Sequence, residues 1–245
     1  MKKYYVLLAH LLLALLIIMA PAGCNSNDLS IEHNEEELLA NNRELENGVA
    51  LPAPVIEEGS VAEALNYRTS VRNFSDQPLD QDQAAALLWA AVGKQVDGLT
   101  GPTRTIPSAG GTYPLELYLL AGNVEGIEPG LYRYDYDNHA LQPLQLEDRR
   151  ALLAEAALDQ GFIAEAPAVL VLTARYERTT GRYGDRGIRY VLIDAGHASQ
   201  SISLQAVELG LGTVVIGAFE DQKVAEILTV EGEPLLILPV GVPAQ

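Results

Sequence analysis

Residues 67–72 read Tyr-Arg-Thr-Ser-Val-Arg, and they concentrate positive charge in a chain whose 33 acidic residues outnumber its 16 basic ones. Arg68 and Arg72 are four residues apart, so at the end of a helix both guanidinium groups can converge on one point. The Ser70 hydroxyl and nearby backbone N–H groups add donors, and such a cluster suits a phosphate. An isolated R-x-x-x-R pattern is more often two solvated arginines beside carboxylates. The rest of the chain must decide between these interpretations.

The hydrophobic pattern on both sides of this segment predicts one α+β domain. Helices are expected over Val61–Tyr67, 80–93, 146–158 and 188–209. Strands are expected over Leu115–Ala121, 131–135, 168–173, 213–217 and 235–240. This order is neither all-β nor a regular βαβ alternation, so a sheet flanked by helices is favoured.

Two further segments are rich in glycine and other small residues, at 107–114 (Pro-Ser-Ala-Gly-Gly-Thr-Tyr-Pro) and at 210–217 (Gly-Leu-Gly-Thr-Val-Val-Ile-Gly). The second is not a dinucleotide fingerprint, because Val215 occupies the third glycine position and the run leads into a strand. The four histidines are scattered, and the sequence contains neither a Walker A motif nor H-E-x-x-H. Neither a Rossmann site nor a metal site is therefore expected.

Taken together and in this order, segments 68–72, 107–114 and 210–219, with 123–135 and 190–197, resemble the nitroreductase superfamily. The resemblance covers about residues 51–242. Within the superfamily it is strongest to the SagB-type dehydrogenases, which include the oxidases that turn azolines into azoles in peptide natural products. It implies FMN as cofactor and an α+β homodimer with two equivalent sites at the subunit interface.

The resemblance also implies three sets of FMN contacts. The segment that grips the flavin phosphate and ribityl chain is matched by Arg68, Ser70 and Arg72. The loop that reaches the flavin, usually across the interface, is matched by Pro107, Ser108, Ala109 and Gly110. The strand whose backbone lies near the redox-active atoms is matched by residues 212–217, including Gly212, Thr213, Val214 and Gly217. On its own, this last segment would be an ordinary strand after a tight turn.

The sequence departs from the family pattern at two places. Residues 239–245 hold no basic residue, where many nitroreductases add one, so phosphate binding would rest on Arg68 and Arg72. The Lys-Tyr pair of azole-forming members is matched by Arg182 and Tyr183. An arginine, with a pKa above ~12, does not readily act as a base, whereas Tyr183 can still donate or accept a proton. The alternative is that Arg182 only pairs with nearby carboxylates on a surface loop.

Asp194 and His197 are three residues apart on the expected long helix. The sequence places no nucleophile beside them, and a buried structural histidine is the commoner arrangement. Tyr132, Tyr134 and Tyr136 alternate along a strand and its end, which is typical of packing rather than of a substrate platform.

The N-terminus predicts export and a membrane anchor. Residues 1–23 have the basic start, apolar centre and small-residue exit of a lipoprotein-type signal peptide. Cys24, the only cysteine, stands where such precursors are acylated, and residues 24–50 resemble a polar, acidic tether. An uncleaved signal anchor is the alternative. The protein is therefore expected outside the cytoplasm, with its domain at 51–245.

These patterns predict an FMN-dependent oxidoreductase with a small-molecule or peptide substrate and NAD(P)H as a candidate electron donor. The formal charge of −17 disfavours nucleic acid as a partner. The alternative is a membrane-tethered flavin- or ligand-binding protein of the same fold that has lost turnover.

Overall fold

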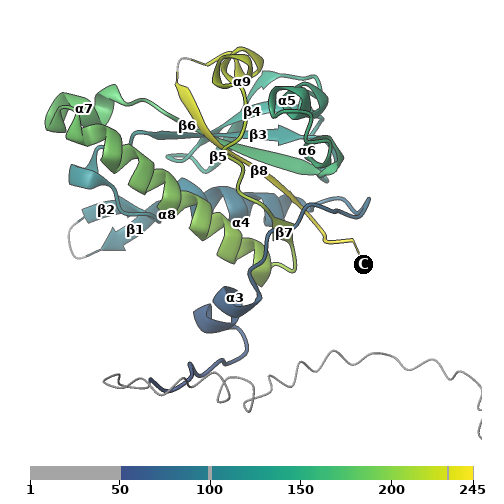
Figure 1. Ribbon diagram of the computed structural model, residues 1–245, viewed down its shortest axis with the longest axis horizontal. Coiled ribbons are helices and arrows are strands. Elements are labelled where there is room, and N and C mark those ends of the chain that lie inside the picture. Colours follow the sequence, from purple (N-terminus) through teal and green to yellow (C-terminus); the bar gives the residue numbers. More distant parts are fainter. Residues whose placement is uncertain (1–50, 99–100, 231, 245) are drawn as a thin grey trace, which may run out of the picture. The chain divides into compact units, whose positions relative to one another are not determined.

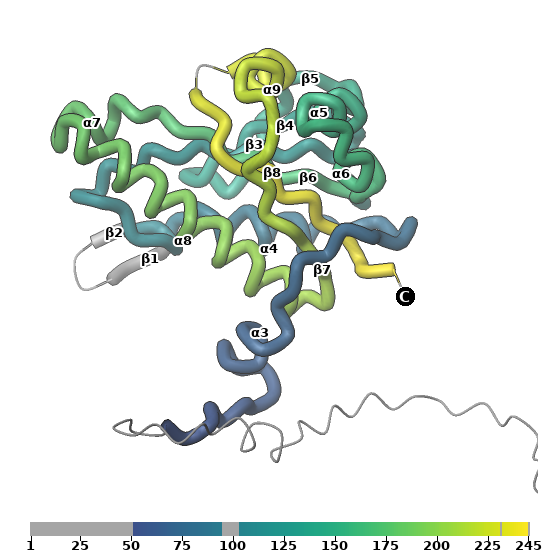
Figure 2. Tube along the Cα trace, viewed as in Figure 1, coloured from purple at the N-terminus to yellow at the C-terminus, as the bar shows by residue number. Residues whose placement is uncertain are grey.

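The computed structural model describes residues 51–98, 101–230 and 232–244. Residues from Ala53 onward belong to one compact unit, whose chain path is shown in Figures 1 and 2. The predictions for residues 1–23, for Cys24 and for most of the 24–50 tether lie outside the described residues.

A six-stranded antiparallel sheet forms the centre of this unit, in the order β5-β4-β3-β6-β8-β7. The strands are β3 (Leu115–Ala121), β4 (Gly130–Asp135), β5 (Ala140–Gln145), β6 (Ala168–Ala174), β7 (Gly212–Thr213) and β8 (Glu233–Gly241). Every residue of β6 is buried, because helices cover both faces of the sheet. Strands β1 (Lys94–Gly98) and β2 (Gly101–Arg104) form a separate hairpin.

The helices form two layers around the sheet (Figure 1). Helices α4 (Gln81–Val92) and α8 (Arg186–Glu208) cover one face, and α5 (Arg150–Ala156), α6 (Phe162–Glu165) and α9 (Asp221–Leu228) cover the other. Each layer has its own apolar core, to which alternate residues of β3 and β6 contribute. Helices α3 (Val61–Tyr67) and α7 (Glu177–Tyr183) lie near opposite ends of α8. This arrangement confirms the α+β fold.

Helix α8 is long because apolar or small residues recur on its sheet-facing side every three or four positions. Its buried residues include Val191, Ala195, Ala198, Ile202 and Ala206. Gly210, at φ +70°, follows the end of the helix and turns the chain toward β7. The predicted helix at 188–209 is thereby confirmed, with a start two residues earlier.

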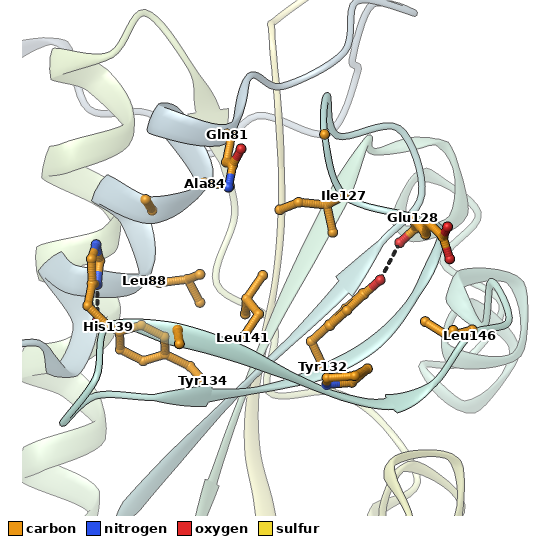
Figure 3. Close-up of a pocket in the computed structure, with 14 residues that line it drawn as sticks. Gln81, Ala84, Leu88, Ile127, Glu128, Tyr132, Tyr134, His139, Leu141 and Leu146 are labelled. Atoms are coloured by element: carbon orange, nitrogen blue, oxygen red, sulfur yellow. Dashed lines mark hydrogen bonds between the residues drawn. The ribbon is translucent and has the colours of Figure 1, made fainter.

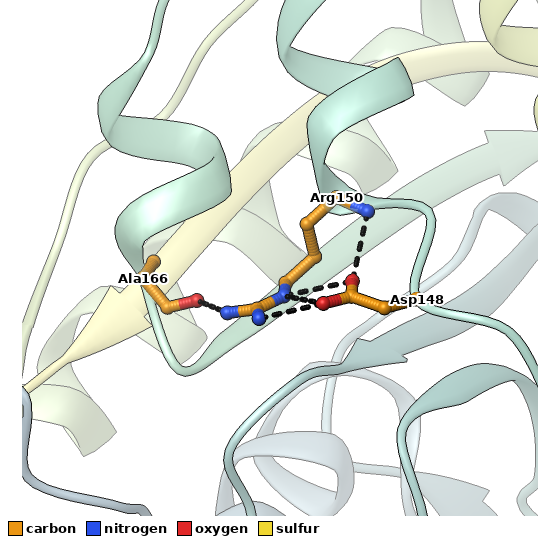
Figure 4. A network of polar contacts seen from close by, with 3 residues as sticks. All are labelled: Asp148, Arg150 and Ala166. Carbon is orange, nitrogen blue, oxygen red and sulfur yellow. Dashed lines mark hydrogen bonds and ion pairs between the residues drawn. The ribbon is translucent and has the colours of Figure 1, made fainter.

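Contacts of Arg150 join the start of α5 to the end of α6 (Figure 4). The Arg150 guanidinium donates to the Asp148 carboxylate, at 2.8 Å from Nη2 to Oδ2, and to the carbonyl oxygen of Ala166. The hydrogen bonds from Arg150 lower the pKa of Asp148. A Cβ on Gly122 would lie within 2.1 Å of three Arg150 guanidinium atoms, so only glycine leaves room for this contact. These contacts hold the start of α5 against the end of α6.

Several expectations from the sequence need correction. The helix expected over 146–158 is only α5: residues 146–149 are not helical, and Leu158 has left-handed backbone at φ +60°. The strand expected over 213–217 is only β7, after which Ile216 alone bridges to β8. Helix α7 occupies the segment for which a surface loop was the alternative interpretation. The elements α6, α9, β1, β2 and β5 were not predicted.

In the described part of the chain, no helix combines the length and apolar character that a membrane span requires.

Candidate functional site

The arginine segment that follows α3 is extended rather than helical. The backbone N–H of Val71 donates to the carbonyl oxygen of Thr213 at 3.0 Å, and Ser70 forms a parallel bridge with Thr213. In an extended chain alternate residues share a side, so Arg68, Ser70 and Arg72 point to one side. All three are exposed, whereas Val71 is partly buried. The helical convergence predicted for the two arginines is therefore wrong, but the extended backbone still aligns them.

The arginine segment packs directly against β7. A Cβ on Gly212 would lie 2.6 Å from a methyl carbon of Val71, so a glycine is required for this close approach. The Thr213 hydroxyl donates to the carbonyl oxygen of Pro239 at 2.8 Å, which ties β7 to β8. The side chains of Arg68 and Arg72 form no hydrogen bond or ion pair with any described residue. Two unpaired guanidinium groups beside a rigid strand edge can receive an anion.

The loop at 107–111 is held by a buried carboxylate of α8. Ser108 Oγ donates to Asp194 Oδ2 at 2.6 Å and accepts the backbone N–H of Tyr113 at 3.0 Å. Asp194 is only 3% exposed. Burial raises the pKa of this carboxyl, against the opposing effects of the Ser108 hydrogen bond, the charge of His197 and the backbone N–H of Ala109. Asp194 therefore fixes the position of Ser108 and of the turn that follows.

The same turn meets Arg182 and Tyr183 of α7. Arg182 Nη1 donates to the carbonyl oxygen of Gly110 at 3.1 Å. Gly110 has φ +62°, and a Cβ there would lie 2.3 Å from the hydroxyl oxygen of Tyr183. The Tyr183 ring packs edge-on against Tyr190, with ring centroids 5.1 Å apart. We call Ser108, Gly110, Arg182, Tyr183 and Asp194 the loop cluster.

Two further arginines, Arg178 of α7 and Arg104 of β2, support the end of the loop at Tyr113. Arg178 donates to the carbonyl oxygen of Tyr113 at 3.1 Å and to the Glu116 carboxylate at 2.5 Å. The guanidinium of Arg104 lies between two aromatic rings, 4.5 Å from the Tyr113 centroid and 3.5 Å from that of Tyr136. Burial lowers the pKa of Arg104. These contacts fix the end of the loop, so the polar groups of the loop cluster are positioned in advance.

The other residues predicted from the sequence to contact the cofactor lie in the loop at 107–111 and in the segment that follows β7. Pro107 is exposed and Ala109 is partly buried in the loop, where Ala109 begins a short 3₁₀ turn. After β7, the side chain of Val214 is buried while Gly217 is exposed. The backbone N–H of Ile216 donates to Ile237 at 2.9 Å, so this N–H is occupied by the sheet.

The arginine segment and the loop cluster lie near opposite ends of α8 (Figure 2). Asp194, eight residues after the start of the helix, holds Ser108 of the loop cluster, and Glu208, the last residue of the helix, precedes β7. At about 1.5 Å per residue, the intervening helix measures roughly 20 Å. A single chain therefore does not bring the two groups of residues together.

Asp194 is the functional-site candidate that sequence reasoning undervalued. His197 is exposed rather than buried, so the structural-histidine interpretation is wrong, while Asp194 is the buried member of the pair. A signal was present: Asp194 shares its helical face with Val191, Ala195 and Ala198, all buried. A carboxylate within an apolar stripe requires a polar partner. That partner is Ser108, 86 residues earlier in the chain.

A separate cavity of about 620 Å³ lies between α4, the turn at 126–128 and the β4–β5 hairpin (Figure 3). Tyr132 Oη donates to the carbonyl oxygen of Glu128 at 2.8 Å, and Tyr134 Oη lies 2.7 Å from His139 Nδ1. Burial raises the pKa of Tyr134 to about 12. Both tyrosines are buried, as expected for packing residues. No residue predicted for the cofactor or for catalysis lines this cavity.

Residues 65–242 match the model of the nitroreductase family. A nitroreductase-like protein of Methanocaldococcus jannaschii is 46% identical over 188 residues, which cover 77% of this chain and 93% of that protein.

Solved structures show the same fold. A nitroreductase-like protein of Ralstonia eutropha superimposes with a TM-score of 0.65 at 30% identity, covering 80% of this chain and 89% of its own. A chain of the Escherichia coli microcin synthetase McbBCD, solved with truncated pro-MccB17 bound, gives 0.64 at 25% identity, with 84% and 82% covered. The NADPH:FMN oxidoreductase of Vibrio harveyi, solved with NAD+, shares the fold alone, at 19% identity and a TM-score of 0.55 over 76% and 69% of the two chains.

Proposed function

The chain belongs to the nitroreductase family, and from this premise we propose that it is an FMN-dependent oxidoreductase acting on an organic substrate. The observation that carries the proposal is the pair of unpaired arginines, Arg68 and Arg72, aligned with Ser70 beside the edge of β7. In a chain of net charge −17, two exposed guanidinium groups without carboxylate partners among the described residues are best explained by an anionic ligand. The phosphate of FMN meets this requirement.

The donor set fits FMN in chemistry as well as in charge. Arg68 and Arg72 would hold the phosphate, with Ser70 as a further donor. The segment from Gly212 to Gly217 and the loop from Pro107 to Gly110 would contact the ring, where small residues allow backbone groups to approach. FMN, when bound, supplies the acceptance and donation of hydride or electrons, and the protein supplies orientation and electrostatics. NAD(P)H is the candidate electron donor.

A homodimer with shared sites follows from the length of α8. Because the arginine segment and the loop cluster are roughly 20 Å apart along this helix, a two-fold partner with antiparallel α8 would place its loop cluster next to this chain's arginines. The uncovered side of α8 supports such pairing, because the large apolar residues Ile188, Leu192 and Ile193 are 47%, 53% and 46% exposed there. We therefore assign each FMN site to residues of two subunits.

The proton chemistry of the proposed site falls to Tyr183. The Arg182 guanidinium is engaged with the carbonyl oxygen of Gly110 and remains charged, so it orients the loop and offers positive charge. The Tyr183 hydroxyl, next to Gly110, is the group that can give or take a proton. A proton-accepting substrate such as a quinone or a nitroaromatic suits this pair better than an azoline, whose oxidation needs a base at the substrate carbon.

Two substitutions test this assignment in FMN-loaded protein. We expect Arg182→Lys to raise any azoline-oxidising activity, because a lysine, unlike an arginine, can lose its proton and act as a base. We expect Tyr183→Phe to lower that activity, because it removes the hydroxyl that gives or takes a proton. Turnover of quinone, nitroaromatic and azoline substrates is measured side by side. Efficient azoline oxidation by the unaltered protein, without a response to Tyr183→Phe, would refute the role given to this pair.

The second candidate function is a flavin- or ligand-binding protein of the same fold without turnover. The occupied Arg182, at the position of the lysine in azole-forming members, is the observation that favours it. The ultraviolet–visible spectrum of the purified chain separates the two functions. Flavin bands that bleach with a reductant and return with an acceptor support the enzyme, whereas flavin that is bound but not reoxidised by any acceptor supports the binding protein.

For the location, we propose that Cys24 is lipidated and tethers the domain outside the cytoplasm. Cys24→Ser should then lose the acyl attachment while the domain folds as before. Mass spectrometry of the mature N-terminus in the native host is the measurement. An unprocessed Met1 would instead identify an uncleaved signal anchor.

A further inference from the structure

Among the described residues, four arginines have side chains without a hydrogen bond, an ion pair or an aromatic contact. Two of them are Arg68 and Arg72 of the arginine segment, and the other two are Arg186 and Arg189, in the first turn of α8. Other basic side chains in this part of the chain have partners, as in the Lys94–Asp137 and Lys223–Glu220 ion pairs. The proposed FMN site does not use Arg186 or Arg189, so this second pair needs its own explanation.

The local charge around the second pair is opposite to that of the protein. Residues 175–189 contain five arginines and only two acidic residues, Glu177 and Asp185, in a chain of net charge −17. Arg186 and Arg189 are three residues apart, so their side chains are neighbours on the helix surface. Both are exposed. Unpaired like charges at this spacing repel each other, and a bound anion would remove that cost.

The second pair adjoins the loop cluster. Arg186 begins α8 three residues after Tyr183, and Gly187 packs so tightly on α7 that a Cβ there would lie 2.8 Å from the Thr180 backbone. Tyr190, next to Arg189 in the chain, forms the edge-on pair with Tyr183. An anionic group held by the two arginines would therefore sit beside aromatic rings and beside the loop proposed to reach the flavin.

Building on the proposed function, we propose that Arg186 and Arg189 form a binding site for the anionic group of the substrate. The substrate class is a planar aromatic molecule that carries a carboxylate or a phosphate. The guanidinium groups bind the anion by charge-assisted hydrogen bonds. The rings of Tyr183 and Tyr190, which pack edge-on against each other, lie beside the planar part. The site provides specificity for charge, whereas Tyr183 and Arg182 act at the reacting end.

The test compares three probes that differ in charge at one position: 4-nitrobenzoate, 4-nitrophenyl phosphate and the neutral 4-nitrobenzamide. Each is titrated by calorimetry into the FMN-loaded full chain at low ionic strength. We expect the better of the two anions to bind roughly tenfold more tightly than the amide. The affinity order of the anions identifies the carboxylate or the phosphate as the preferred group. Added salt should reduce the preference, because ions screen exposed charges.

Matched double variants decide the assignment. Arg186→Gln with Arg189→Gln should reduce the preference for the anion to about one, whereas Arg133→Gln with Lys223→Gln, which changes net charge equally at other exposed positions, should retain it. An unchanged preference in the first variant, or no preference in the wild type, would overturn the proposal. A comparable loss of FMN affinity in that variant would also overturn it, because the arginines would then belong to the cofactor site. If the wild type binds no FMN, the proposed function fails, and the same titrations on the cofactor-free chain still test the arginine pair.

Discussion

Removing both guanidinium groups of the arginine segment should weaken FMN binding about a hundredfold without changing protein stability. The perturbation is Arg68→Gln with Arg72→Gln. Both side chains are exposed and unpaired with described residues, so no ion pair is lost, and the backbone stays in place through the Val71 N–H bond to Thr213. Exposed substitutions of this kind alter the free energy of unfolding by no more than about 0.5 kcal/mol.

The magnitude follows from the exposure of the two groups. A hydrogen bond to a charged group contributes about 1.5–3 kcal/mol, and solvent screening places exposed arginines at the lower limit. Two contacts of about 1.5 kcal/mol each correspond to roughly a hundredfold change in the dissociation constant. The effect should shrink as salt is added, because the Debye length falls from ~30 Å at 0.01 M to ~8 Å at 0.15 M.

The assay is a calorimetric FMN titration of the full chain at two salt concentrations, with thermal unfolding followed in parallel. The control is Arg133→Gln with Lys223→Gln, which makes the protein more negative by the same two charges but leaves the arginine segment intact. Equal FMN affinity in the wild type and in both double variants would refute the phosphate assignment. Equal weakening in both variants would show that net charge alone, rather than a site, controls binding.

Three further outcomes are expected. Gly110→Ala should lower the melting temperature by about 2–8 °C, since left-handed backbone costs a residue with a Cβ about 1–2 kcal/mol. Gly181→Ala, with open space around its Cβ, should not lower it, and equal melting temperatures would contradict the strained turn. Because burial raises the pKa of Asp194, the stabilising contribution of the protonated carboxyl is present at low pH and is lost as pH rises through the raised pKa. The melting temperature of Asp194→Asn should therefore rise relative to that of the wild type from pH 4 to pH 7, and a constant difference would argue against this titration. Light scattering should show a dimer that dissociates in Leu192→Glu but not in the control Leu152→Glu, an exposed position on α5. A monomer that still binds FMN would rule out shared sites.

Much of the fold could be predicted because, in several elements, the local sequence pattern already matches the structure that the packed fold requires. Helix α3 matches its predicted bounds, since Ser60 caps its first turn, and α4 begins with a capping box from Asp80 to Gln83. The buried strands β3 and β6 have mainly apolar sequences, interrupted by Glu116 and Thr173. Helix α7 was missed because its sequence, with two threonines and a glycine, has low helix propensity. Its packing against α8 and its contacts with the loop compensate.

By itself, the sequence predicted which residues would carry the chemistry: two arginines and a serine at alternate positions, a small-residue loop, and the Arg182-Tyr183 pair. Residue type and short-range spacing are local properties, so they can be interpreted without a structure. Only the tertiary structure decided which of these residues meet. The Ser108–Asp194 hydrogen bond joins positions 86 residues apart, and the rigid length of α8 separates the arginine segment from the loop cluster. Such distances depend on how helices and strands pack, because side chains far apart in the chain become neighbours only when the apolar faces of those elements are buried together.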